Sequence, residues 1–268
     1  MAPGFRTFRT GLLLESKAGK YLAFAVVEVT LIIIGILIAL QVNNWNVERV
    51  EQRRVRELAH ALVTDLEDDI ADLELILLQM TFTLKSVDAI SSYTRGKTLD
   101  QIDNLDLWFL TSTMGYRPYN WKRATIDVFK STGALQNIRN PELVTLITRY
   151  EALTHHLDTD HQGDAERLRA TKTLAAGLVD GNYPDSEEAD SVTRKMIRGP
   201  YEFPPKSLHE IYKGHELQLL TDDMNRIRML TNVASQVGEL GARVEHELPG
   251  AISMARTLIE LLKAEYPE

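Results

Sequence analysis

The sequence contains no cysteine among its 268 residues. This absence excludes a disulfide scaffold, thiolate metal sites and cysteine nucleophiles, although it says little about the compartment. Positive charge is also scarce, because 30 Lys and Arg stand against 38 Asp and Glu, a net charge of −8. Nucleic-acid binders present a positive surface to phosphate, so we expect no nucleic-acid partner. With 44% apolar and 25% charged residues, the composition is still that of a folded protein.

The motifs of common enzymes are missing as well. The sequence has no phosphate-cradling glycine loop, no dinucleotide fingerprint and no G-x-S-x-G nucleophile turn. The dipeptide His-Glu occurs three times, but a second histidine never completes the HExxH zinc motif, because that position holds Lys213, Leu219 or Gly250. We therefore expect no cofactor, and an enzyme would need a site assembled from distant residues.

One long apolar run is present, from Tyr21 to Leu40, in which only Glu28 and Thr30 are clearly polar. At about 1.5 Å per residue, a helix of this length covers roughly 30 Å, the thickness of a bilayer's hydrocarbon core. The run is longer than the apolar core of a cleaved signal peptide, and no small-residue cleavage pattern follows it. We therefore expect an uncleaved signal anchor, with a transmembrane helix at 21–44 that contacts the lipid bilayer.

Three residues of this segment are candidates for contacts with the membrane or with a second helix: Glu28, Gly35 and Trp45. A charge at the bilayer centre costs at least about 2.5–3.5 kcal/mol. Glu28 either reaches the headgroups from a span that starts near Val26, or donates a hydrogen bond, when protonated, to another helix. The second interpretation implies a homo-oligomer or another membrane protein as partner. Residues 1–20 are expected to be a basic tail, unstructured or lying on the membrane as a short helix.

The end of the span carries a resemblance to a known family. Residues 35–46 read GILIALQVNNWN, preceded by Glu28 and followed by an Arg/Glu-rich segment. This stretch resembles an uncharacterised bacterial family of single-span membrane proteins with a span of the same type near the N-terminus. A weaker similarity follows at Ser131, Gly133, Leu135, Asn140, Leu143 and Tyr150. The resemblance implies a protein of the bacterial inner (cell) membrane and supplies no activity.

The orientation of the span depends on the Lys and Arg beside it. Four precede it and four follow: Arg6, Arg9, Lys17 and Lys20, then Arg49, Arg53, Arg54 and Arg56. The count is tied, but a short basic tail before the first apolar segment is the usual arrangement of a signal anchor. We therefore expect the N-terminus in the cytoplasm and the helical domain outside it.

Beyond the span, apolar residues recur about every 3.5 positions from Val55 to Ile90, which is typical of a coiled coil or a bundle. Neither proline nor glycine interrupts residues 47–95, so we expect one long helix that ends at Gly96. Its apolar seam needs a partner, either from its own domain or from another copy. An acidic run falls mostly off the seam and is expected to be a solvated face rather than a cation site: Asp65, Glu67, Asp68, Asp69, Asp72 and Glu74.

The remaining segments are also helical in pattern, and none shows the period-two alternation of a strand. Asn140 with Pro141 predicts a helix start. Four prolines predict a long loop or flap at 181–206. Pro249 is expected to break or kink the helix that begins at Ser207, before the last helix. The predicted helices are 99–113, 124–131, 141 to about 178, 207–237 and 251–264. The fold class is therefore all-α, with the transmembrane helix continuing into an antiparallel helical bundle over 45–268.

Two groups of residues could carry chemistry. The densest metal-capable group matches no known ligand spacing, so we expect a solvated helix surface there and no metal site: His155, His156, Asp158, Asp160 and His161. Aromatic residues between 108 and 129 either fill the core where a loop crosses the bundle or line a ligand cleft. The candidate cleft residues are Trp108, Tyr116, Arg117, Tyr119 and Trp121.

The leading hypothesis is a non-enzymatic, membrane-anchored helical module that binds a partner or senses a ligand. One alternative is a membrane-tethered enzyme with an unrecognised site. Another is a structural protein that organises the membrane or envelope as an oligomer.

Overall fold

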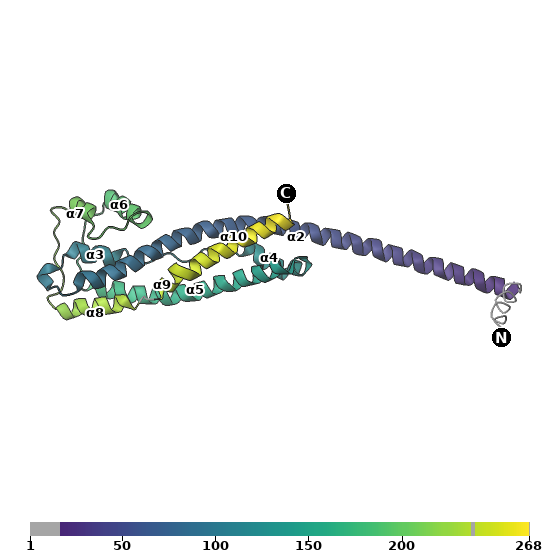
Figure 1. Ribbon diagram of the computed structural model, residues 1–268, viewed down its shortest axis with the longest axis horizontal. Helices are drawn as coiled ribbons and strands as arrows, with labels where there is room; N and C mark the ends of the chain where they lie inside the picture. The colour runs from purple at the N-terminus through teal and green to yellow at the C-terminus, as the bar shows by residue number, and fades with distance from the viewer. Residues whose placement is uncertain (1–16, 237–238, 268) are drawn as a thin grey trace, which may run out of the picture. The chain divides into compact units, whose positions relative to one another are not determined.

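The computed structural model describes residues 17–236 and 239–267 (Figure 1). All regular elements of these residues are helices and none is a strand, which confirms the all-α prediction. Of the predicted basic tail, residues 1–16 lie outside the described residues. In chain order the elements are α2 (Lys17–Thr94), η1 (Leu99–Gln101), α3 (Asn104–Ser112), α4 (Ala124–Ser131), η2 (Ala134–Asn137), α5 (Pro141–Ala176), α6 (Glu187–Arg198), α7 (Lys206–Ile211), α8 (Met224–Ser235), α9 (Leu240–Ala242), η3 (Arg243–Glu247) and α10 (Leu248–Glu265).

Helix α2 continues without a break through the predicted span to Thr94, as the absence of proline and glycine after the span predicts. It is followed by Gly96, whose φ of +72° lies in the left-handed region that ends many helices. Among the described residues, α2 is the one helix long and apolar enough to cross a membrane. The chain divides into two compact units, one ending at Arg56 and the other beginning at Glu57.

In the second unit, the chain's own helices cover the apolar seam of α2. Five residues of the seam are at most 1% exposed: Leu62, Leu66, Leu73, Met80 and Ile90. Helix α10 lies alongside α2 and α5 in Figure 1. Two ion pairs join it to α2, Arg256 to Glu74 at 2.7 Å and Lys263 to Glu67 at 2.9 Å. The apolar seam of α2 is therefore covered within its own domain, which is one of the two predicted possibilities. The seam by itself gives no reason to expect that a second copy of the chain covers it.

The prediction of a long loop at 181–206 is wrong, because α6 lies within it. The Ser186 side chain accepts a hydrogen bond from Ala189 N at 3.2 Å and caps the helix. Acidic residues then fill the first turn, where they interact favourably with the positive end of the helix dipole. The prolines that suggested a loop stand outside this helix and leave it intact.

The predicted single helix over 207–237 is also wrong. Helix α7 ends at Ile211, and Gly214 with φ of +89° turns the chain away. Helix α8 begins only at Met224, where the Asp223 carboxylate accepts from Asn225 N at 2.9 Å. The apolar residues between the two helices kept the sequence pattern periodic across a non-helical connection.

Pro249 does not break the last helix, contrary to one of the predicted outcomes. Elements α9, η3 and α10 follow one another directly, and η3 is a π-helical turn in which Leu248 N donates to Arg243 O. Proline lacks an N–H, and its ring crowds the carbonyl four residues before it. A wider turn directly before Pro249 relieves that crowding, and π-helical turns recur at functional sites.

Candidate functional site

Between α3 and α4 the chain crosses the helical domain without regular secondary structure, and we call residues 113–123 the strap. Side chains of α2 hold its main chain at both ends. Thr83 Oγ1 accepts from Gly115 N at 2.9 Å, and Asp69 Oδ1 accepts from Lys122 N at 2.9 Å. These bonds fix the position of the aromatic side chains that the strap carries.

The acidic run of α2 is not merely the solvated face that its spacing predicts. Asp69 is 3% exposed, and its second carboxylate oxygen accepts from Tyr150 Oη of α5 at 2.8 Å. Burial raises the pKa of Asp69. Asp72 pairs with Arg117 of the strap at 2.7 Å. These two acids join α2 to the strap and to α5, whereas Asp68 is exposed as predicted.

The strap is also bonded to α5. Trp121 Nε1 donates to Asp158 Oδ1 at 2.9 Å, and Arg123 Nη2 donates to Asp158 Oδ2 at 2.6 Å. The Trp121 ring stacks on Tyr119 with centroids 5.0 Å apart. Asp158, which the sequence places among the metal-capable residues, therefore has both carboxylate oxygens occupied by the strap.

A buried ion pair lies where the strap, α5 and η3 meet. The Asp164 side chain is 0% exposed and that of Arg243 is 5% exposed, with Arg243 Nε 3.3 Å from Asp164 Oδ2. Tyr116 Oη donates to the same oxygen at 2.7 Å. Burial raises the pKa of Asp164, while the hydrogen bond from Tyr116 and the charges of Arg243 and Arg167 oppose the rise. The carboxylate is thus bonded on one side and inaccessible to solvent.

Hydrogen bonding around this ion pair is incomplete. Five buried side-chain atoms there have no hydrogen-bond partner: Tyr119 Oη, His161 Nδ1, Asp164 Oδ1, Arg243 Nε and Glu247 Oε2. Asp164 and Arg243 are nevertheless paired by charge. Burial also lowers the pKa of His161, which favours its neutral ring. Buried polar atoms are nearly always bonded, so a group of exceptions marks a candidate site for an ion or ligand. We call these five residues, together with Tyr116, the polar centre.

Two groups among the described residues have the ligand types of a metal site. In each group, three ligand atoms lie within 4.8 Å of one another: His156, Asp160 and Glu247 in the first, Asp103, Asp106 and His209 in the second. The sequence spacing predicts that His156 and Asp160 share one face of a helix. The third residue of their group, Glu247, comes from η3. The rest of the predicted histidine group separates, since His155 pairs with Glu151 at 4.0 Å and the His161 ring packs 4.9 Å from Tyr116.

The residues predicted as a possible ligand cleft lie in two places. Trp108 lines a hollow of about 490 Å³ beside α5. Tyr116 and Arg117 line a different hollow, of about 340 Å³. Tyr119 and Trp121 are half-buried against the core, which agrees with the alternative that these rings fill a loop crossing. Ligand binding at these residues stays a prediction.

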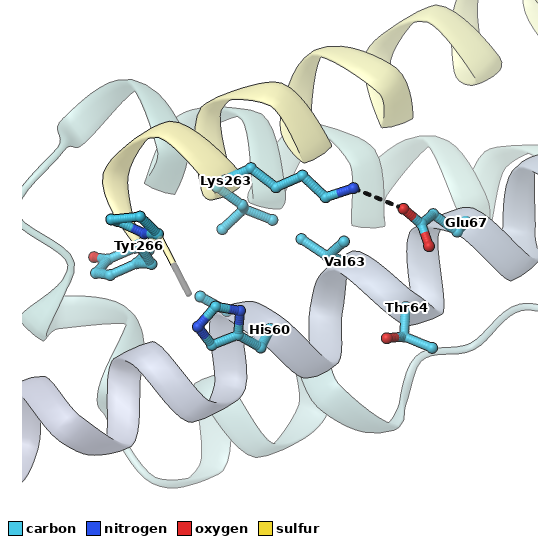
Figure 2. Close-up of a pocket in the computed structure, with 9 residues that line it drawn as sticks. His60, Val63, Thr64, Glu67, Lys263 and Tyr266 are labelled. Atoms are coloured by element: carbon cyan, nitrogen blue, oxygen red, sulfur yellow. Dashed lines mark hydrogen bonds and ion pairs between the residues drawn. The ribbon is translucent and has the colours of Figure 1, made fainter.

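A hollow of about 790 Å³ that no sequence motif indicates lies between α2 and α10 (Figure 2). His60 and Val63 of α2 face Lys263 and Tyr266 across it, and Lys263 Nζ donates to Glu67 at 2.9 Å. Tyr266 Oη is buried without a hydrogen-bond partner. With its charged pair satisfied, this hollow offers fewer open polar groups than the polar centre.

The residues predicted to contact the membrane or a second helix lie on the surface of α2. Glu28 is exposed, and Trp45 is 61% exposed with the Arg49 guanidinium 5.7 Å from its ring centroid. Beyond its chain neighbours and the nearby backbone of α2, nothing described lies within 4 Å of a Cβ built on Gly35. This open surface leaves all three residues accessible to lipid or to another helix.

Comparison with known protein families gives a match to part of the chain. No curated protein and no solved structure matches the chain. The matched segment begins at Glu28, includes the strap and ends in the first part of α5, before His156. Residues 28–152 match a domain family that has no established function, described as Family of unknown function (DUF6090).

Proposed function

We propose that this chain is a single-pass membrane protein whose all-α domain is a non-enzymatic binding module. The observation that carries the membrane proposal is the surface of α2 between Tyr21 and Val50, where large apolar side chains are 46–80% exposed. Transferring one such side chain out of water is worth about 1.5–3 kcal/mol. Exposure of this apolar surface to water is unfavourable, and a bilayer would cover it on every side of the helix.

The hydroxyl group of Thr30 in this segment is compatible with lipid. Thr30 Oγ1 donates to Val26 O at 2.7 Å, so the hydroxyl is satisfied within the helix. Trp45 suits the interface at the end of the run. Gly35 gives the helix a small surface patch through which a second helix can approach closely. These features support a span near 21–44. The bacterial inner membrane and a cytoplasmic N-terminus belong to the proposal as well, and they rest on the family resemblance and on the short basic tail before the span.

Binding rather than catalysis is supported by the burial of the titratable groups. Burial raises the pKa of two carboxyl groups, those of Asp69 and Asp164, which are 3% and 0% exposed. Both are bonded to tyrosine hydroxyls, of Tyr150 and Tyr116. A general acid or base must reach the proton that it transfers, and neither group is accessible to a substrate. They hold the strap and the helices together. Glu247 of the polar centre, with His156 and Asp160 beside it, remains as a binding site.

Carbonate extraction of membranes tests the anchor. The full chain is expected to stay in the membrane pellet. Arginine at Ile32 and Ile36 together should release it, because each charge near the bilayer centre costs at least about 2.5–3.5 kcal/mol. The matched control places arginine at Leu78 and Met229, apolar residues of the helical domain that are 41% and 57% exposed. Extraction of the unaltered chain, or equal release of both variants, would contradict the anchor.

Labelling of intact cells tests the orientation. The chain has no native cysteine, so one introduced thiol reports alone. Glu216→Cys in the connection between α7 and α8 is a suitable site, because Glu216 is exposed and lies outside the helices. A membrane-impermeant maleimide is expected to label Glu216→Cys in intact cells. Labelling only after the inner membrane is opened would place the domain in the cytoplasm.

A further inference from the structure

Glu247 of the polar centre and two neighbouring side chains of α5, His156 and Asp160, have the spacing of a metal site. His156 Nε2 lies 3.3 Å from Asp160 Oδ2, because residues four apart on a helix share a face. In a tetrahedral zinc site with bonds of about 2.0–2.1 Å, ligand atoms lie about 3.4 Å apart. The Glu247 carboxylate completes a group in which all ligand atoms are within 4.8 Å. For one ion to bind all three, the Glu247 ligand atom must come to about 3.4 Å from the other two.

Glu247 also has an open ligand position. Its Oε2 atom is buried and has no hydrogen-bond partner. Leaving a buried polar group unpaired is unfavourable, and more so when the group is charged. A cation bound by Glu247 and Asp160 would give the Glu247 carboxylate a partner and relieve the repulsion between the two carboxylates.

Arg243 orients the Asp160 carboxylate. Its Nη2 lies 3.5 Å from Asp160 Oδ1, which leaves Oδ2 facing His156. Such outer contacts fix the direction of ligating carboxylates in metal sites. The surrounding charge also favours a cation, because four carboxylates meet two guanidinium groups here: Asp160, Asp164, Glu239 and Glu247 against Arg167 and Arg243.

We propose that His156, Asp160 and Glu247 bind one divalent transition-metal ion of the zinc type. One imidazole with two carboxylates suits zinc and its neighbours, whereas magnesium and calcium prefer oxygen ligands alone. The His156 side chain is 58% exposed, so the ion can enter from solvent and keep a water as its fourth ligand. The second group fits less well, because the Asp103 carboxylate already caps α3 and His209 already bonds to Asp106 at 2.8 Å.

Titration of the full chain in detergent with zinc chloride tests this site, with a purification tag that contains no histidine. We expect one zinc ion per chain by isothermal titration calorimetry. His156→Gln and Glu247→Gln should each weaken zinc binding at least about tenfold. Loss of a group that only supports a metal ligand already weakens binding by about this factor, and these two residues are proposed to be ligands themselves. The matched control is His155→Gln, since His155 forms a similar pair with Glu151 at 4.0 Å that belongs to no three-ligand group of the described residues.

A second readout separates loss of binding from loss of folding. Zinc should raise the melting temperature of the unaltered chain and of His155→Gln, but not that of the other two variants, whose far-UV spectra should be unchanged without metal. Absence of saturable zinc binding, or equal weakening by His155→Gln and His156→Gln, would overturn the site. The site deepens the proposed binding function. A chain that resists carbonate extraction but binds no zinc overturns the metal site alone, and a zinc-binding chain that leaves the membrane overturns the anchor alone.

Discussion

Removal of the Arg243 guanidinium is expected to destabilise the helical domain strongly. The side chains of Arg243 and Asp164 are 5% and 0% exposed, so Arg243→Met would leave a buried carboxylate without its closest positive charge. Removing one partner of a buried ion pair costs about 3–5 kcal/mol. Tyr116 Oη at 2.7 Å and Arg167 Nη1 at 3.8 Å remain near Asp164, so we expect a loss of about 3 kcal/mol, at the lower end of that range.

A matched control for this variant is Arg167→Met. Arg167 belongs to the same charge network, pairing with Glu239 at 2.7 Å, but its side chain is 41% exposed. Exposed ion pairs contribute about 0–1 kcal/mol, because water screens them. The two substitutions remove the same chemical group from one network, so the difference between their effects measures the contribution of burial.

Urea unfolding followed by far-UV circular dichroism measures both variants, at fixed detergent and with a chelator present. For a domain of this size, about 3 kcal/mol corresponds to a fall in melting temperature of about 6–12 °C, with at most about 4 °C for Arg167→Met. If Arg243→Met loses less than about 1 kcal/mol, or no more than Arg167→Met, the buried pair does not stabilise the fold in the way argued.

Three further predictions concern the titration of Asp164, the soluble domain and the span. Burial raises the pKa of Asp164 above its ordinary value of 3.8, so the folded chain takes up a proton before the unfolded one as the pH falls. Acidification from neutral pH towards 3.8 should therefore raise the melting temperature of the unaltered chain relative to that of Asp164→Asn. A difference in melting temperature that stays constant across this range would contradict the prediction. Residues 1–46 contain four Lys and Arg and two Asp and Glu, so residues 47–268 keep 26 basic and 36 acidic residues, a net charge of −10. A protein of residues 47–268 should therefore be soluble, and its circular dichroism spectrum should be that of helix rather than strand. Glu28→Leu should change the oligomer distribution of the full chain in detergent, measured by crosslinking or mass photometry, and monomer alone for both chains would exclude association through Glu28.

Helix ends with a local chemical signal could be predicted from the sequence. The Asn140 side chain accepts from Glu142 N at 3.0 Å, and Pro141 occupies the first turn, as their order along the chain indicates. Ser186 offers the same type of signal, yet the prolines on both sides of α6 favoured a loop. The prediction of a loop failed because it extended the effect of the prolines to the whole segment. A proline restricts only its own residue and its near neighbours.

The polar contacts of the site could not be predicted, because their partners are distant in the sequence. Asp69 lies 53 residues from Lys122 and 81 from Tyr150, the two residues that bond to it. Periodicity describes only which face of α2 a residue occupies, and the strap covers part of the face that the pattern assigns to solvent. A buried carboxylate and an exposed one have the same sequence signature until the covering segment is known.

The third ligand of the proposed metal site shows the same limit in a more specific way. The spacing of His156 and Asp160 indicates a shared helix face, but two ligands are common on solvated helices and do not define a site. Glu247 joins them because a π-helical turn precedes Pro249, where sequence reasoning allows only a break or a kink. The proline pattern predicts a break or a kink, although a wider turn can relieve the proline's clash and continue the helix. The residue that turns a histidine–carboxylate pair into a candidate site therefore lies where the helix departs from regular geometry.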